Sequence, residues 1–543
     1  MKNLAVCLLL TTSLATGLAP AARAADFGAY LASQFAASQG QIGLAASQIG
    51  MALDADPSSL ELQKDAFGLG LLAGTPDVDR LAALLPQNPV AELVLADAQA
   101  RAGHWDQAEL AYAELPHESL MDLLRPVLVA WAQQARGDTD KALETLQGGI
   151  DGGHMSAFYT LHSALIADVA RRDGLADRLY TQLAQDMTEP NVRMTQIEAS
   201  WQARSGRVSV ARDTIDTLIR ANPELAIVRK GMIESAATPQ IADAKAGIAE
   251  AYAGMAGALR QDKQGDFPPM LLQLALRMEP GLTEARLIQG ELAAAQKRYG
   301  AAAETLAQIS PHDPLAPVVQ MHLASYLSHS GQATKAEAIL QGLELAYPDR
   351  NEPPAQLGDV YIGERKYADA VAAYGRAIAL TPHPVKGDWT LFYARGAALE
   401  RVHDWPRAEA DMHEALKLSP DQPVVLNFLG FSWAEQNRNL PQARDMIQRA
   451  LEQRPNDGAI VDSLGWVVLR LGDVQRAVQL LQQAAELEPV DPTITGHLGD
   501  AYWDAGRHVE AEDQWRRALV LKPDPEEASR IEARLKSASA GAP

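Results

Sequence analysis

Few residues of this 543-residue chain have the types and spacing of catalytic or metal-binding groups. His322 and His329 lie seven residues apart and could share a helix face, but no histidine or carboxylate stands four residues from either, as in a helical zinc site. Asp500 and Asp504 are four apart, so on one helix the two carboxylates could shift each other's pKa. Solvated histidines and surface acids explain both pairs more simply. We therefore predict no enzyme activity, no catalytic or metal site and no cofactor.

The remaining motifs of common enzymes are also missing from the sequence. It contains no His-Glu-x-x-His, no Gly-x-Ser-x-Gly, no phosphate-binding loop and no calcium-binding loop. The single cysteine, Cys7, excludes disulfides within the chain and paired-cysteine metal sites. A binding protein is therefore a simpler interpretation than an enzyme.

The charge balance restricts the class of partner. Lys and Arg number 48 against 69 Asp and Glu, a net charge of −21. Such an acidic chain is repelled by phosphate backbones and by anionic lipid, so we expect no nucleic-acid partner. With 47% hydrophobic and 22% charged residues the chain is too apolar for wholesale disorder.

The N-terminus has the pattern of an export signal. Lys2 precedes an apolar run from Leu4 to Leu18, and Ala22-Arg23-Ala24 follows as a small-x-small cleavage site. The run is too short for a membrane span, which needs about 20 residues, so we expect no transmembrane segment. We predict that residues 1–24 are a signal peptide, cleaved near Ala24, and that the mature chain is periplasmic.

A lipid anchor is not expected. The nearest match to a lipoprotein motif, Leu14-Ala15-Thr16-Gly17, is followed by Leu18 and not by cysteine. Cys7 lies inside the apolar run and would leave with the signal peptide. The mature chain would then have no thiol, which suits an oxidising compartment.

The elements that must position any binding residue are repeats of about 34 residues. Prolines recur at this spacing, and small residues recur in the same phase, from Ala256 through Gly290 to Gly499. A 34-residue period with small residues at fixed positions resembles the tetratricopeptide (TPR) repeat, a pair of packed helices. The prolines are Pro280, Pro314, Pro348, Pro382, Pro420, Pro455, Pro489 and Pro523.

The last repeat shows why these positions matter. Gly499 would let the partner helix approach closely, Ala511 and Ala518 would face that partner, and Pro523 would end the second helix. The period fades towards the N-terminus. We predict an all-α, right-handed TPR superhelix of about 13 to 15 hairpins. Divergent hairpins would occupy 25–245, a regular array 246–535 and a flexible tail 536–543, with longer loops near 381–388 and 437–440.

A binding surface is expected where the first helices of successive TPR hairpins line the inner side of the superhelix. Side chains directly after the packing glycine, or three before it, should point there. Aromatic residues flanked by a few hydrogen-bonding groups suit a protein partner. Packing within the hairpin is the alternative for each aromatic, above all for Trp503. The predicted groove residues are Tyr393, Asn427, Phe431, Asp462, Trp466, Arg470, Asp500 and Trp503.

Three stretches carry a closer family resemblance: Leu426-Asn-Phe-Leu-Gly-Phe-Ser-Trp433, Asp462-Ser-Leu-Gly-Trp-Val-Val-Leu469 and His497-Leu-Gly-Asp-Ala-Tyr-Trp503. They resemble a proteobacterial family of exported TPR proteins, adaptors that hold a carboxy-terminal processing protease and its substrates, including peptidoglycan hydrolases. The resemblance implies a non-catalytic adaptor with those partners. The chain departs from the best-understood members in lacking the lipobox cysteine, which puts membrane tethering in doubt.

Other functions stay open at this point. The chain could instead be an assembly or structural factor for envelope polysaccharide export or outer-membrane machinery. An unrecognised active site built on Asp462, Asp500 and Asp504 is a rival from another class. The oligomeric state is unknown, because apolar runs such as Leu81–Leu85 could be interface or core.

Overall fold

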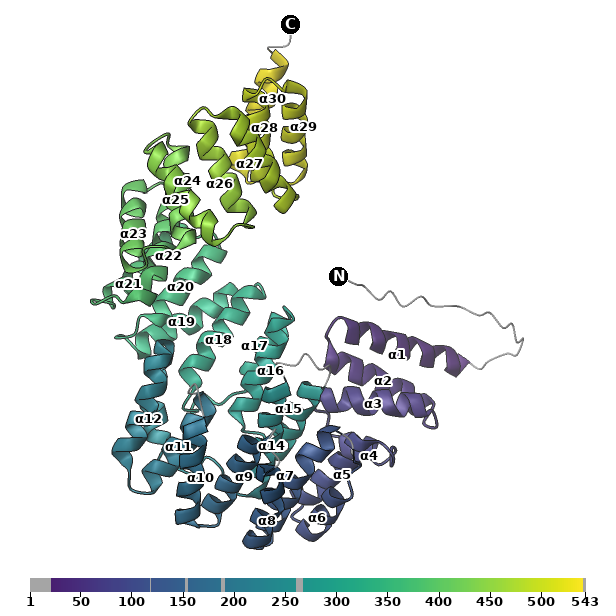
Figure 1. The fold of residues 1–543 in the computed structure, drawn as a ribbon. Coiled ribbons are helices and arrows are strands. Elements are labelled where there is room, and N and C mark those ends of the chain that lie inside the picture. Colours follow the sequence, from purple (N-terminus) through teal and green to yellow (C-terminus); the bar gives the residue numbers. More distant parts are fainter. Residues whose placement is uncertain (1–20, 118, 152–154, 187–190, 260–266, 541–543) are drawn as a thin grey trace. The chain divides into compact units, whose positions relative to one another are not determined.

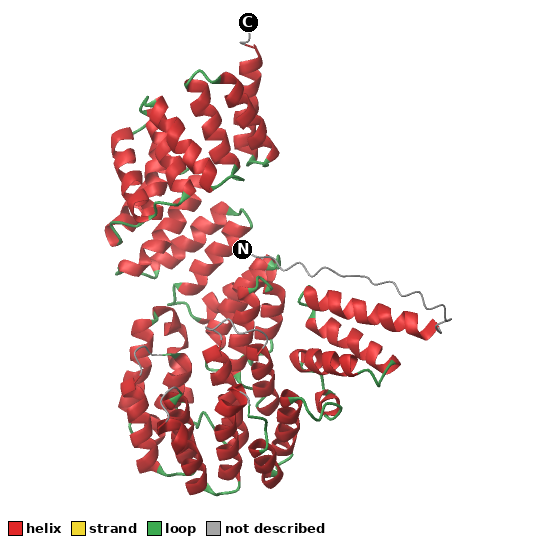
Figure 2. Ribbon diagram, turned by 45° about the vertical axis from the view of Figure 1, so that its right-hand side comes forward, coloured by secondary structure: helices red, strands yellow, loops and turns green. Residues whose placement is uncertain are grey.

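The computed structural model describes residues 21–117, 119–151, 155–186, 191–259 and 267–540. Most of the predicted signal peptide, including Cys7, lies outside these residues. The chain divides into two compact units, residues 1–335 and 336–543, which we describe separately. Figure 2 shows helices joined by short loops, and the described residues contain no strand.

The helices of the first unit form hairpins in chain order, and each hairpin packs on the next (Figure 1). Their bounds are α1 Ala21–Ser38, α2 Ile42–Ala55, α3 Leu60–Ala73, α4 Val78–Ala82, α5 Pro89–Arg101, α6 Trp105–Ala113, α7 Ser119–Ala135, α8 Thr139–Asp151, α9 Ser156–Val169, α10 Asp173–Asp186, α11 Val192–Arg204, α12 Val208–Ala221, η1 Pro223–Val228, α13 Arg229–Ser235, α14 Ala244–Leu259, α15 Phe267–Met278, α16 Thr283–Ala295, α17 Tyr299–Leu306 and α18 Ala316–His329.

The second unit has the same hairpin order and begins within α19. Its helices are α19 Ala333–Ala346, α20 Glu352–Gly363, α21 Tyr367–Ala379, η3 Lys386–Asp388, α22 Trp389–Arg401, α23 Trp405–Leu418, α24 Pro423–Glu435, α25 Leu440–Gln453, α26 Gly458–Arg470, α27 Val474–Leu487, α28 Pro492–Asp504, α29 His508–Val520 and α30 Pro525–Ala540. The predicted all-α solenoid of stacked hairpins is confirmed. The predicted change from divergent to regular repeats at residue 245 is a property of the sequence and stays a prediction.

Local signals explain where the helices begin and end. The Asp491 carboxylate accepts hydrogen bonds from the N–H groups of Thr493 and Ile494 at 2.8 and 3.0 Å, so it caps α28 just before Pro492. Gly506, at a φ of +77°, makes the left-handed turn into α29. Both predicted insertions fall between α-helices, at 380–388, where the chain forms the short η3, and at 436–439.

The repeated small residues bring the two helices of a hairpin together. A Cβ added at Gly499 of α28 would lie 2.5 Å from the Trp515 ring of α29, and one added at Gly465 would lie 2.7 Å from Leu481. Real Cβ atoms do not approach so closely. The glycines are therefore required by packing, as the sequence predicts.

Gly499→Ala should destabilise the second unit by about 1–3 kcal/mol, because the buried Trp515 ring has no room to yield. Gly342→Ala on α19 is the matched control: nothing lies within 4 Å of its added Cβ, so it should stabilise the helix by about 0.5–1 kcal/mol. Urea unfolding followed by tryptophan fluorescence measures both. Equal midpoint shifts in the two variants would contradict the packing argument.

Candidate protein-binding face

The eight residues predicted to line a groove all lie on the first helices of hairpins in the second unit. Tyr393 is on α22, Asn427 and Phe431 are on α24, Asp462, Trp466 and Arg470 are on α26, and Asp500 and Trp503 are on α28. Three of them are buried, three are half-buried side chains on α22 and α24, and Arg470 and Trp503 lie nearer the C-terminal end; whether any of them binds a partner stays a prediction.

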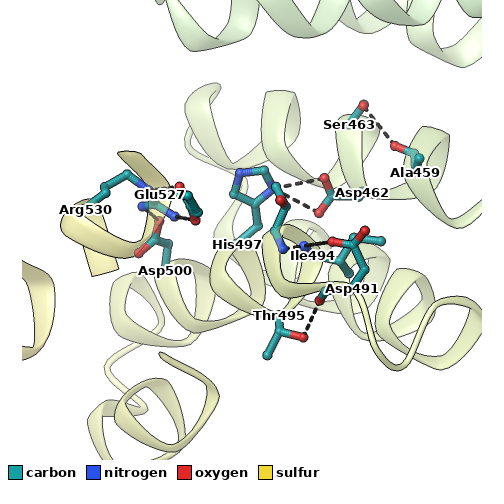
Figure 3. A network of polar contacts seen from close by, with 11 residues as sticks. Ala459, Asp462, Ser463, Asp491, Ile494, Thr495, His497, Asp500, Glu527 and Arg530 are labelled. Carbon is teal, nitrogen blue, oxygen red and sulfur yellow. Dashed lines mark hydrogen bonds and ion pairs between the residues drawn. The ribbon is translucent and has the colours of Figure 1, made fainter. Parts of the chain in front are cut away.

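Asp462, Trp466 and Asp500 are buried, with only 4, 5 and 3% of their surfaces exposed. The structure corrects the expectation that these side chains are exposed. Helix α28 packs beside α26 and places His497 over two of them. Its ring stacks on Trp466 with centroids 4.2 Å apart, and its Nδ1 lies 2.9 and 3.0 Å from the two Asp462 oxygens (Figure 3).

The pair of His497 and Asp462 is a buried ionic contact. Burial alone would lower the pKa of His497, but the adjacent Asp462 carboxylate outweighs it, and the pKa is raised above its ordinary value. The Asp462 carboxylate therefore favours the protonated form of His497 over the neutral form. Neither group is left for general acid–base chemistry with a substrate, and the sequence analysis did not identify His497 at all.

Asp500 holds the last three helices together. Its Oδ1 accepts from Trp515 Nε1 of α29 at 3.0 Å, and its Oδ2 pairs with Arg530 of α30, which also binds Glu527 (Figure 3). Arg534 lies 3.6 Å from the same carboxylate. The side chain is thus committed to internal contacts with α29 and α30.

The aspartate–aromatic contact recurs at one spacing. Tyr112 donates to Asp97 at 2.7 Å and Tyr374 donates to Asp359 at 2.6 Å, each across 15 residues, as Trp515 does to Asp500. In these hairpins an aspartate on the first helix is therefore hydrogen-bonded to an aromatic side chain on the second helix. This spacing was visible in the sequence and could have identified these aspartates as structural.

The predicted residues on α22 and α24 are Tyr393, Asn427 and Phe431, and we call these three residues the candidate binding face. All three are half-buried. Tyr393 meets Phe428 edge to face at 6.0 Å, which links α22 to α24. Asn427 Oδ1 is itself buried and has no hydrogen-bond partner among the residues that the structure describes. Partly exposed aromatic surface on two adjoining hairpins can accept an apolar side chain from a partner.

The other two predicted residues lie apart from this face or at its margin. Trp503 packs on Trp515 at 5.5 Å and on His508 at 4.2 Å, so it serves the α28–α29 hairpin. Arg470 is exposed, with its guanidinium 4.9 Å from the Trp466 ring centroid. Trp503 therefore packs within its own hairpin, as the alternative interpretation of this residue expects.

In the first unit, the first helices of several hairpins are covered by the chain itself. Helix α14 packs on α7 and α9, while α15 packs on α3 and α5 (Figure 1). Trp131 of α7 lies against Gly247 of α14, and Tyr252 of α14 donates to Asp97 at 2.8 Å. This surface is occupied internally, which leaves the second unit as the better place for a partner.

The part of the chain that the structure describes carries neither a metal-binding cluster nor a membrane-spanning helix. Within it, no three His, Cys, Asp or Glu side chains gather as metal ligands. His322 and His329 of α18 are both exposed. No described helix combines the length and apolar character that crossing a bilayer requires.

Comparison with known families identifies the repeat. A tetratricopeptide-repeat family model matches residues 356–423, 393–458 and 463–528, all in the second unit. These windows contain the helices from α20 to α29, including the candidate binding face.

Curated relatives extend the likeness. A TPR repeat-containing protein of Pseudomonas aeruginosa is 29% identical over 214 residues, which cover 39% of this chain and 35% of the relative. Cellulose synthase operon protein C of Pseudomonas fluorescens is 23% identical over 505 residues, 88% of this chain and 37% of the relative. The chain thus spans about a third of the length of either relative.

Among solved structures, the Cut9–Hcn1 tetramer of the APC/C aligns over 94% of this chain and 96% of its own, at 14% identity and a TM-score of 0.39. The family match, by contrast, rests on residues that the structure explains: packing glycines and alanines at 34-residue spacing, within helical hairpins. Residues 356–528 of the second unit therefore contain tetratricopeptide repeats.

Proposed function

We propose that this chain is a non-catalytic scaffold that binds a partner protein through the candidate binding face. One observation carries the proposal: Tyr393, Asn427 and Phe431 keep accessible surface on adjoining TPR hairpins whereas the neighbouring first helices α26 and α28 are buried. Two proteins held on one frame meet at a raised effective concentration, which is how a scaffold without catalytic groups accelerates a reaction.

We place the scaffold in the periplasm. The support is the signal-peptide pattern of residues 1–24, with its small-x-small site at Ala22-Arg23-Ala24. The absence of cysteine after Cys7 agrees with an oxidising compartment.

The first candidate partner is a carboxy-terminal processing protease together with its substrates, such as peptidoglycan hydrolases. This candidate is supported by the resemblance of 426–433, 462–469 and 497–503 to exported TPR adaptors of such proteases. Phe431 belongs to the first of these segments and to the candidate binding face.

The second candidate is a role in envelope polysaccharide export. Here the support is the relative named cellulose synthase operon protein C, which aligns with 88% of this chain. The name of that relative ties it to a cellulose synthase operon.

A pull-down from envelope extract separates the candidates. The bait is the full chain, compared with a Tyr393→Ala, Phe431→Ala variant and with a Val509→Ala, Val520→Ala control that removes equally apolar but exposed side chains of α29. Mass spectrometry should find a partner held by the wild type and the control and reduced at least about tenfold in the face variant, because truncating buried aromatic anchors costs about 2 kcal/mol or more.

The identity of that partner decides between the two candidates. A processing peptidase would support the adaptor, and polysaccharide-export proteins would support the second candidate. Equal recovery by all three baits would overturn the candidate binding face. Both variants must show wild-type circular dichroism so that a loss of binding is not a loss of fold.

A further inference from the structure

Helix α1 carries an exposed apolar stripe that nothing in the described residues covers. Phe27, Leu31 and Phe35 expose 62, 50 and 68% of their surfaces. Residues four apart on a helix lie nearly above one another, so the three side chains form one continuous ridge two turns long. Exposed large apolar residues are ordinary when scattered, but an aligned set marks an interaction surface.

The opposite face of α1 is fixed to its neighbours. Ser33 and Ala36 are fully buried, and Ser33 Oγ donates to the carbonyl of Ala45 on α2 at 2.8 Å. Gln34 lies on the ridge's own side, seven residues after Phe27, and its Nε2 donates to Asp65 on α3 at 3.2 Å, so the Asp65 carboxylate borders the ridge. Helix α2 is the principal neighbour of α1 (Figure 1). The ridge is thus held facing outwards by contacts on the other side of the helix.

The charge pattern selects what can cover this ridge. Between Asp26 and Asp54 the chain has no charged residue, although 22% of the whole chain is charged. A partner's charge placed on the ridge itself would be buried without a counter-charge from α1, which is costly, and acidic partner groups would also meet Asp65 at the edge of the ridge. Anionic membrane is disfavoured too, because α1 offers no Lys or Arg after Arg23 and the chain carries a net charge of −21.

We propose that the ridge binds the same ridge of a second copy of this chain, with two α1 helices antiparallel about a two-fold axis at Leu31. A two-fold interface needs a self-complementary surface, and an uncharged apolar ridge meets that need. The charge-free stretch is also where two acidic chains repel each other least. This proposal is independent of the proposed function.

Sedimentation velocity of the purified full chain tests the proposal. A single-helix contact buries less than the about 1,600 Å² of a standard interface, so we expect a monomer–dimer equilibrium within the accessible protein range. Phe27→Glu with Phe35→Glu should raise the dissociation constant at least about tenfold, because each dimer would bury four unpaired carboxylates. Val509→Glu with Val520→Glu, equally exposed on α29, should leave it unchanged.

Cross-linking tests the geometry. Leu31→Cys, made in a Cys7→Ser background, should form an intermolecular disulfide under mild oxidation, since residues on the two-fold axis meet their own copies. Val509→Cys is the control and should not. A monomer at every concentration, or a dimer indifferent to the Phe27 and Phe35 changes, would overturn the proposal. The proposal would also be overturned if the chain is monomeric and binds phosphatidylcholine–phosphatidylglycerol vesicles, and the Phe27→Glu, Phe35→Glu variant loses that binding.

Discussion

The wild-type first unit should lose several kcal/mol of unfolding free energy as the pH rises from about 4 to 8, and Asp97→Asn should abolish this pH dependence. Asp97 lies on α5 with none of its surface exposed. Its Oδ1 accepts from Tyr112 of α6 at 2.7 Å and from Tyr252 of α14 at 2.8 Å, so one carboxyl group joins three helices.

The expected pH dependence follows from burial. Desolvation raises the pKa of Asp97 from 3.8 to about 7, against the opposing effect of the two tyrosine hydroxyls and of Arg101 and Arg277. The unfolded chain releases this proton near pH 4, whereas the folded chain keeps it until about pH 7. Stability from this group is therefore complete below pH 4 and is lost as the pH rises to about 7, by about 4 kcal/mol in all.

Asparagine keeps an acceptor for both tyrosines but cannot ionise. Its amide nitrogen would take the place of Oδ2, which has no partner in the structure, at a cost of about 1–3 kcal/mol that does not vary with pH. The informative quantity is therefore the difference in unfolding free energy between variant and wild type, measured by urea at pH 4.5 and pH 8. We expect this difference to shift by several kcal/mol in favour of the variant.

Asp54→Asn, at the exposed end of α2, is the matched control and should give a difference that is nearly constant with pH. If the difference in unfolding free energy between Asp97→Asn and the wild type is also constant with pH, Asp97 is already ionised at pH 4.5. The charged form would then be stabilised by Arg101 and Arg277 more than burial opposes it.

Asp462→Ala should destabilise the second unit by about 3–5 kcal/mol at pH 6, because it breaks a buried pair and removes the carboxylate that offsets the cost of burying His497. The pKa of His497 is raised by Asp462 despite burial. A histidine whose pKa is raised on folding contributes stability that is complete below its pKa in the unfolded chain. That stability is lost as the pH rises through its pKa in the folded chain. The destabilisation should therefore be smaller at pH 9 than at pH 6.

Urea unfolding followed by tryptophan fluorescence measures this effect, since Trp466 stacks on His497. Asp504→Ala, an exposed aspartate on the same helix as His497, is the control and should change stability by less than about 0.5 kcal/mol. An equal loss at both pH values for Asp462→Ala would mean that the contact is a neutral hydrogen bond.

Much of the fold could be predicted because its signals are local and repeated. The 34-residue period, the packing glycines and the prolines after second helices each act within one hairpin. Gly499 against Trp515 is a contact between adjacent helices, so spacing alone predicts it. The insertions near 381–388 and 437–440 lengthen loops without disturbing the stack, because each hairpin contacts mainly its neighbours.

The candidate site was predicted less well, and the reason is geometric. Trp466 and Phe431 hold the same position in their repeats, directly after the packing glycine, yet Trp466 is buried and Phe431 is only half-buried. His497 of α28 stacks on Trp466 with centroids 4.2 Å apart, whereas its ring lies 6.0 Å from that of Phe431 and is tilted to it. Repeat position does not encode how closely successive first helices approach, because that distance depends on small rotations summed over hairpins.

By itself, the sequence determined the all-α class, the hairpin as the unit and the residues that pack within each hairpin, because these depend on periods and on side-chain volume. Only the tertiary structure decided that α14 and α15 cover the first helices of the first unit, through contacts such as Asp97 with Tyr252, 155 residues apart. It also decided which groove residues stay accessible. Both outcomes depend on contacts between hairpins, and no local pattern specifies a contact between segments so far apart in the chain.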